Sequence, residues 1–211
     1  QWIDKKDWVY QTIFEISESE FAKQHHEIKF EGLDTYATVI LNDTVILKSD
    51  NMHRTYIVDS KPILNIGKNF LKIILESPIK RALELYDNLN YTIPVSANDQ
   101  AETGEVENGK RVSVFTRKAG YHYGWDWGPR LVTSGIWRPI TLISWSDFRI
   151  KKLDIKYTLE DSAYITTYTE IESSTDNSNA NLLIKLNDSN VVNSKLKLKK
   201  GLQTVISHFF P

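Results

Sequence analysis

The chain has 211 residues, of which 41% are apolar and 11% aromatic, so it can bury one large core or two smaller ones. Its formal net charge is −1, which argues against a broad basic surface and against non-specific binding to nucleic acid. No stretch approaches the roughly 18 apolar residues of a membrane-spanning helix. Cysteine is absent, which excludes disulfides and thiolate metal sites and leaves the compartment open. A neutral ligand fits this composition best.

Alternating apolar residues predict a series of short strands in the first part of the chain. The segment Trp8–Ile16 alternates with a period of two and is rich in β-branched and aromatic residues, as is typical of a strand with one face in a core. Residues 35–41 and 45–47 are separated by Asn42-Asp43-Thr44, which suits a hairpin turn because Asn and Asp tolerate positive φ. Further strands are expected at 27–31, 56–59, 63–66 and 69–76, with a turn at 67–69. This spacing is typical of a sandwich or barrel.

The strand pattern is interrupted between Ser77 and Lys110. Apolar residues in 79–89 recur at near-helical spacing, which predicts one short helix after Pro78. The segment 94–110 is polar, and we expect it to be a mobile excursion. Strand character returns at 111–116 and at 137–145.

A second unit is predicted to begin near Phe148. Strand-like alternation occurs at 148–157, 163–171, 182–186 and 195–198, with a polar turn at 173–181. Residues 148–211 are fewer than the roughly 100 of an immunoglobulin-like sandwich, so we expect a partial sandwich that is poorly ordered or completed by neighbouring molecules. The predicted fold class is therefore all-β, with one β-sandwich over residues 1–147 and a partial one over 148–211.

The most informative segment lies between Tyr121 and Pro139. It reads Tyr-His-Tyr-Gly-Trp-Asp-Trp-Gly-Pro-Arg and, after a short polar stretch, Gly-Ile-Trp-Arg-Pro. Gly124, Gly128 and Pro129 bracket the Trp-Asp-Trp tripeptide. Because glycine adopts unusual φ values and proline removes a hydrogen-bond donor, we predict a shaped loop here.

Two indoles beside one carboxylate favour sugar recognition. The faces of Trp125 and Trp127 can pack on the C–H side of a pyranose, while Asp126 can accept hydrogen bonds from its hydroxyls. The alternative is that the tryptophans fill the core and that Asp126 caps a turn or pairs with Arg130; the residues alone leave both interpretations open. Trp137 opens a predicted strand, and we expect it to be a core residue whose truncation costs roughly 3–5 kcal/mol.

Other chemistries find little support in the sequence. There is no Gly-x-Ser-x-Gly elbow and no phosphate-binding Gly-x-Gly-x-x-Gly or Walker pattern. The histidines lack partners at ligand spacing, so we expect no metal and no cofactor. Glycosidases use a pair of carboxylates, and Glu31, Asp34, Asp126 and Asp154 lie on predicted turns or strand ends. None has the context of a nucleophile, so we expect no catalytic pair in this chain.

Several unusual motifs occur in order along residues 1–145. They are Phe30-Glu-Gly-Leu-Asp-Thr-Tyr-Ala, Asn42-Asp, Asn51-Met-His-Arg-Thr-Tyr, Gly67-Lys-Asn-Phe-Leu, Tyr123-Gly-Trp-Asp-Trp-Gly-Pro-Arg and Gly135-Ile-Trp-Arg-Pro. Together they closely resemble the β-mannosidase branch of family 2 glycoside hydrolases. The resemblance implies a jelly-roll, galactose-binding-like domain, then an immunoglobulin-like domain, a (β/α)8 barrel and further sandwich domains.

The same resemblance implies roles for individual residues. Both catalytic glutamates would lie in the barrel, so no catalytic residue is expected in this chain. Asp126 would hydrogen-bond sugar hydroxyls, Trp125 and Trp127 would line the pocket, and Arg130 would hold Asp126 and the loop. The implied partners are a β-mannoside oligosaccharide and the catalytic barrel of the same polypeptide, with no nucleic acid and no membrane.

The chain departs from the family pattern at both ends. A segment that normally precedes Gln1 is missing and the second domain is cut after Pro211, so we expect a piece of a longer protein. We predict the non-catalytic N-terminal portion of a retaining exo-β-mannosidase that hydrolyses terminal non-reducing β-D-mannose residues. The alternatives are a free-standing carbohydrate-binding module, or another family 2 exo-glycosidase such as an exo-β-glucosaminidase or β-galactosidase.

Overall fold

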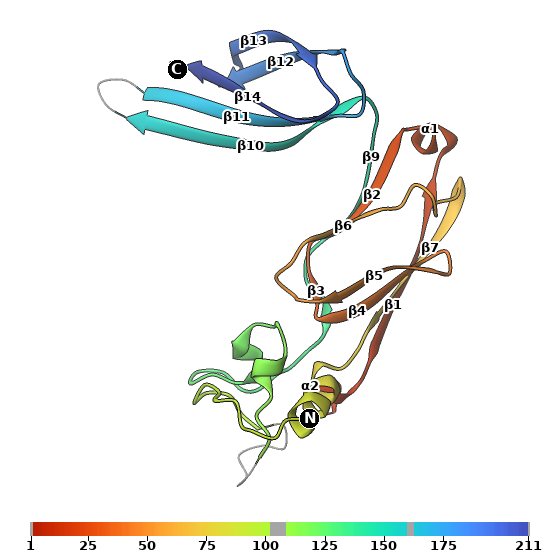
Figure 1. The fold of residues 1–211 in the computed structure, drawn as a ribbon, viewed down its shortest axis with the longest axis vertical. Coiled ribbons are helices and arrows are strands. Elements are labelled where there is room, and N and C mark those ends of the chain that lie inside the picture. Colours follow the sequence, from red (N-terminus) through yellow and green to blue (C-terminus); the bar gives the residue numbers. More distant parts are fainter. Residues whose placement is uncertain (1, 102–108, 160–162, 211) are drawn as a thin grey trace. The chain divides into compact units, whose positions relative to one another are not determined.

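The computed structural model describes residues 2–101, 109–159 and 163–210. The protein is all-β, as predicted, with antiparallel pairing in every registered strand pair. It divides into two compact units, one of residues 1–22 and 26–143, the other of residues 23–25 and 144–211 (Figure 1). The boundary expected at 147/148 stays a prediction.

The larger unit contains a four-stranded sheet in the order β1-β7-β4-β5. Its strands are β1 (Trp8–Ile16), β4 (Tyr36–Leu41), β5 (Thr44–Asp50) and β7 (Gly67–Leu75). The β4–β5 connection is a two-residue turn at Asn42 and Asp43, with φ values of 45° and 65°. These are the positive φ angles that the sequence predicted for this hairpin.

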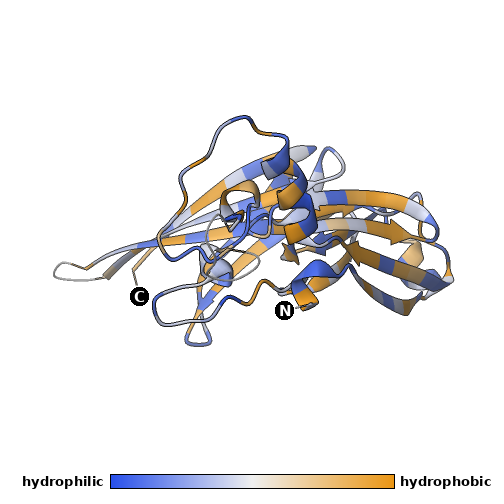
Figure 2. Ribbon diagram, turned by 90° about the horizontal axis from the view of Figure 1, so that it is seen from below, coloured by the Kyte–Doolittle hydropathy of each residue, from blue (hydrophilic) through white to orange (hydrophobic). Residues whose placement is uncertain are grey.

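Further strands of the larger unit form a three-stranded sheet in the order β6-β2-β9 and a short pair, β3 with β8. Their bounds are β2 (His25–Phe30), β3 (Leu33–Asp34), β6 (Tyr56–Asp59), β8 (Gly135–Ile136) and β9 (Ile140–Trp145). Hydrophobic and hydrophilic residues alternate along the strands (Figure 2), as expected for strands with one buried face. The fully buried core side chains include Phe30, Leu33, Val39, Leu41 and Leu75.

The helices of this unit are short. They are η1 (Ile3–Lys5), α1 (Glu18–Phe21), α2 (Pro78–Asp87), η2 (Ser113–Phe115) and η3 (Gly120–Tyr123). The predicted helix is α2, which begins with Pro78 and is capped by the Ser77 hydroxyl accepting from the Lys80 amide. Among the described residues, no helix is long and apolar enough to cross a membrane.

A second, smaller core lies beneath the loops between α2 and β8. Its buried members are Ile79, Ala82, Val112, Tyr123 and Val132. In Figure 1 these loops gather beside α2. The aromatic segment is therefore carried by irregular chain with a core of its own.

Several predicted strands take other conformations. Residues 63–66 form a turn and an irregular segment, and 111–116 contain η2. Gly67 opens β7 instead of a turn, with φ at +80°. The strand expected at 137–145 begins at Ile140, because Pro139 cannot donate to a sheet ladder.

The polar segment 94–110, expected to be mobile, falls partly outside the described residues, which omit 102–108. The described part is not wholly exposed, since Asp99 and Ala101 are both 3% exposed. The amide of Gln100 donates to the Tyr123 carbonyl at 2.8 Å, which ties this segment to the aromatic one.

The smaller unit contains a three-stranded sheet in the order β10-β11-β14 and a β12–β13 hairpin. The bounds are β10 (Phe148–Leu159), β11 (Ala163–Ser173), β12 (Ser178–Leu186), β13 (Ser189–Leu198) and β14 (Gly201–Phe209). Ile171, Leu182, Leu198 and Phe209 are buried. The polar turn expected at 173–181 is shorter, because β11 runs to Ser173 and β12 starts at Ser178.

Candidate functional site

The predicted Trp-Asp-Trp segment forms a tight turn, Trp125–Gly128, called the aromatic turn below. The Trp125 amide donates to the Gly128 carbonyl at 3.0 Å, and the Gly128 amide donates back to the Trp125 carbonyl at 3.2 Å. Asp126 and Trp127 occupy the two central positions. This closed geometry sends both side chains outward from a fixed backbone.

All three predicted substrate-binding side chains are exposed. Trp125 is 42% exposed and Trp127 is 78% exposed, so neither indole fills the core. Asp126 is also exposed, and its side chain makes no hydrogen bond or ion pair with any described residue. The turn therefore leaves two aromatic side chains and one carboxylate exposed, the kinds of group that sugar recognition uses.

Arg130 does not pair with Asp126, and that part of the prediction is wrong. Its side chain is buried, and Nη1 donates to Asp4 Oδ2 at 2.5 Å. The physical reason is that a buried guanidinium needs a buried anion, and Asp126 lies out in solvent. Arg130 thus fastens the end of the aromatic segment to η1, and its support of the loop stays a prediction.

The chain before the turn is fixed by Tyr123 and Gly124. Tyr123 is fully buried, and this burial raises the pKa of its hydroxyl. Gly124 has φ at +115°, and a Cβ at this position would lie 2.8 Å from the Asn98 carbonyl oxygen. Only glycine fits both constraints.

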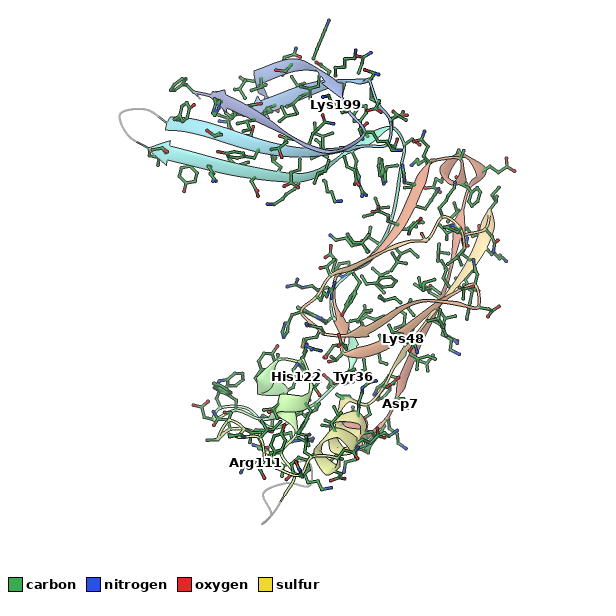
Figure 3. The ribbon with its side chains drawn as sticks, in the orientation of Figure 1. Asp7, Tyr36, Lys48, Arg111, His122 and Lys199 are labelled. Carbon is green, nitrogen blue, oxygen red and sulfur yellow. The ribbon has the colours of Figure 1, made fainter. Side chains whose placement is uncertain are left out.

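The aromatic turn lies at the tip of a longer loop, residues 118–133, called the aromatic loop below. The two arms of this loop are joined by contacts between His122 and Leu131. The Leu131 amide donates to the His122 carbonyl at 2.9 Å, and His122 Nδ1 lies 3.1 Å from the Leu131 carbonyl oxygen. Burial lowers the pKa of His122, and the nearby charge of Lys118 acts in the same direction. A neutral imidazole that donates from Nδ1 satisfies this geometry. His122 is labelled in Figure 3.

Lys118 lies at the root of the aromatic loop. Its ammonium is fully buried, forms an ion pair with the Asp34 carboxylate, and donates to the Thr133 carbonyl at 2.7 Å. Burial lowers the pKa of Lys118, and the negative charge of Asp34 opposes that shift. Asp34 belongs to β3, and its second oxygen accepts from the Thr35 hydroxyl at 2.5 Å.

Met52 holds the same root from another side. Its amide donates to the Arg117 carbonyl at 3.0 Å, and its sulfur lies 3.0 Å from the Ala119 amide nitrogen. Its own carbonyl accepts from Trp137 Nε1 at 3.0 Å. Tyr36, labelled in Figure 3, also reaches from the sheet to this region, because its hydroxyl donates to the Phe115 carbonyl.

Trp137 is not the core residue that the sequence predicted. It is 43% exposed, its amide donates to the Gly32 carbonyl at 3.1 Å, and Arg138 stacks over its ring at 4.2 Å. A Cβ on Gly32 would lie 2.4 Å from Trp137 Nε1, so glycine is required for the indole to lie against β3. The break at Pro139 explains the error, since it removes Trp137 from the regular strand.

Three of the motifs that suggested the resemblance thus converge on the root of the aromatic loop. Gly32 and Asp34 come from the first motif, Met52 from the third and Trp137 from the last, and all four contact the root of the aromatic loop or each other. Sequence reasoning missed Lys118 entirely. A lysine between Arg117 and Ala119 has no local signal, because lysine is ordinarily a surface residue.

No group of three or more His, Asp or Glu side chains within the described ranges is arranged to hold a metal. Of the other predicted acids, Glu31 pairs with Lys29 at 2.5 Å and Asp154 with Lys152 at 2.5 Å. Neither side chain pairs with Asp126 or shares a partner with it. The chemistry that this site offers is therefore recognition by aromatic faces and one acceptor.

Comparison with known proteins assigns the family. The model of the glycosyl hydrolase 2 galactose-binding domain-like family matches residues 1–138. The chain belongs to this family. Among the relatives of the chain, β-mannosidase B of Aspergillus flavus is 34% identical to it over 97% of its length. β-Mannosidase B of Thermothelomyces thermophilus is 39% identical over 67% of it.

A solved structure shows the same fold. The crystal structure of β-D-mannosidase from Dictyoglomus thermophilum matches the present chain over its whole length, with a TM-score of 0.79 and 28% identity. The match covers 25% of the Dictyoglomus chain. The chain likewise spans 24% of the Aspergillus flavus relative and 15% of the Thermothelomyces one. It therefore corresponds to a minor part of these glycoside hydrolases.

Proposed function

We propose that this chain is the non-catalytic N-terminal portion of a retaining exo-β-mannosidase, which removes terminal β-D-mannose residues from the non-reducing end of β-mannosides. The named relatives are β-mannosidases that are much longer than the chain. In this proposal a barrel elsewhere in the polypeptide supplies both catalytic carboxylates for double displacement. Residues 1–147 would be the sugar-binding domain and 148–211 part of an immunoglobulin-like domain.

The observation that carries the proposal is the exposed aromatic turn on a buried support. An exposed indole contributes little to folding, and Trp127 is 78% exposed on a backbone closed by two hydrogen bonds. Asp126 keeps all of its acceptor capacity for a ligand. We assign Trp125 and Trp127 to the wall of the mannose pocket, Asp126 to the sugar hydroxyls, and Arg130 to the support of the loop.

Activity of the complete polypeptide tests this assignment. We expect hydrolysis of p-nitrophenyl β-mannoside at a kcat/KM at least about 100-fold above that for the β-glucosaminide and β-galactoside, a margin of ~2.7 kcal/mol. A preference for either other glycoside would replace the substrate with that sugar. Absence of hydrolysis of all three would reject the glycosidase assignment.

The exposure of both indoles also favours a second function, a free-standing carbohydrate-binding module. Aromatic faces on a rigid turn can bind a sugar without a second wall. Titration of the 211-residue chain with mannobiose separates the two functions. A pocket wall should show no binding up to about 10 mM, whereas a module should bind at about 1 mM or tighter.

A further inference from the structure

We propose that Lys118 is a positioning residue, which sets the direction of the aromatic turn by clamping the root of the aromatic loop to β3. The proposal rests on the proposed function, because it assigns a role in presenting Asp126 to sugar. Lys118 does not touch the ligand in this scheme. It acts through the backbone of the loop.

The first observation is that one ammonium joins three segments. Lys118 belongs to the first arm of the loop, Thr133 to the second arm, and Asp34 to β3. The Lys118 side chain is fully buried and that of Asp34 is 6% exposed. Three donor hydrogens on one nitrogen can satisfy both acceptors at once, whereas a hydroxyl at this position has only one hydrogen to donate.

The second observation is that the loop transmits this constraint to its tip. Across the two arms, Lys118 bonds Thr133, His122 exchanges two contacts with Leu131, and the aromatic turn closes on itself. The three rungs follow one another from root to tip. Releasing the first rung therefore frees the arms to shift and displaces the carboxylate at the end.

The third observation is that the clamp is a buried ion pair, between Lys118 and Asp34. A buried ion pair contributes little net stability compared with apolar residues of similar volume, because both ions lose their hydration. What such a pair does supply is a single arrangement with defined directions. Its place between a sheet strand and both arms of the loop favours orientation as its role.

The decisive test removes the ion pair between Lys118 and Asp34 in a way that allows for a variant that fails to fold. The complete enzyme would carry Lys118→Met alone and the paired change Asp34→Asn with Lys118→Met, which leaves no unpaired buried charge if the single variant fails to fold. We expect either variant to lower kcat/KM on p-nitrophenyl β-mannoside about 10- to 100-fold, since a displacement of about 1 Å at a binding group has costs of this order.

Coupling to Asp126 distinguishes positioning from general stability. In an Asp126→Ala background, Lys118→Met should lower kcat/KM by a clearly smaller factor than in the wild-type background, because part of its effect passes through that carboxylate. The matched control is Leu71→Ala, a buried change on β7 in the main core, which is separate from the smaller core beneath the loop. It should lower the melting temperature while leaving kcat/KM unchanged in folded enzyme.

Two outcomes would overturn the proposal: a folded Lys118→Met enzyme with unchanged kcat/KM, or full additivity with Asp126→Ala. A complete wild-type enzyme without β-mannosidase activity would instead refute the proposed function, and hydrogen exchange of the chain then decides the role of Lys118. Positioning requires amides of residues 122–131 to exchange at least about 10-fold faster in Lys118→Met, with β4 and β7 unchanged. Equal exchange throughout would remove Lys118 as the clamp.

Discussion

The tip and the root of the aromatic loop differ in almost every physical respect. At the tip, Asp126 and Trp127 are exposed, and their side chains bond no described residue. At the root, Lys118 and Asp34 are buried and paired, and Met52 is 4% exposed. The difference teaches that the exposed side chains proposed to meet sugar and the buried side chains that hold the loop are different residues.

The largest effect is expected at the root. Asp34→Ala leaves the Lys118 ammonium buried without its anion, which should lower the free energy of unfolding by about 3–5 kcal/mol. Urea unfolding of the chain measures this loss. Glu31→Ala is the matched control, because its pair with Lys29 is about one-third exposed and should contribute about 1 kcal/mol or less. Equal losses for the two variants would mean that the buried pair at the root stabilises the fold no more than a partly exposed pair does.

At the tip the effect should fall on catalysis alone. Asp126→Ala in the complete enzyme should lower kcat/KM about 10- to 1000-fold, or ~1.4–4 kcal/mol of transition-state stabilisation. The free energy of unfolding should change by less than about 0.5 kcal/mol, as for other exposed positions. Glu15→Ala, an exposed acid on β1, should change neither quantity. Unchanged kinetics for Asp126→Ala would remove this residue from the sugar site.

Trp137 and Trp127 allow the root and the tip of the loop to be compared with the same residue type. Trp137→Ala loses the hydrogen bond to the Met52 carbonyl and the contact with Gly32, and should cost about 1–3 kcal/mol of stability. This is less than for a buried tryptophan, because Trp137 is 43% exposed. Trp127→Ala should cost less than about 0.5 kcal/mol. Thermal unfolding of both variants tests the difference, and a larger loss for Trp127 would reverse the assignment.

The sequence predicted most regular elements and the shaped loop that carries the candidate site. Alternation located β1 and β10, and Asn42-Asp43 located a hairpin turn, because these signals depend only on neighbouring residues. Gly124 and Gly128 correctly indicated a shaped loop. Signals from neighbouring residues were sufficient wherever an element is determined by residues close to it in the sequence.

The root of the loop could not be predicted in this way. Lys118 and Asp34 are 84 residues apart, and the pairing of a buried lysine depends on tertiary packing that leaves no periodic trace. The same limit explains Arg130, whose partner Asp4 lies 126 residues away instead of four. It also explains residues 111–116, where packing beneath the loop overrides strand propensity.

The smallest effect is expected from Asp99, a buried acid under the same loop without an ion-pair partner among the described residues. Its Oδ2 accepts from the Ser113 amide at 3.3 Å, whereas Oδ1 has no partner there. Burial raises the pKa of Asp99 above 3.8, and the hydrogen bonds from Ser113 and the charges of two arginines only partly offset this. Asp34 and Asp99 thus contrast a paired with an unpaired buried carboxylate.

The sign of the pH dependence follows from the raised pKa of Asp99. Between 3.8 and the folded-state value, the native protein holds a proton that the unfolded chain has lost, so the free energy of unfolding falls as pH rises through this window. Asp99→Asn removes that fall while keeping an acceptor for the Ser113 amide. Urea unfolding from about pH 3 to 7 should therefore show the variant gaining stability relative to wild type as pH rises. A curve for Asp99→Asn that runs parallel to wild type would contradict the prediction, and would mean that water reaches this carboxyl group in the native protein.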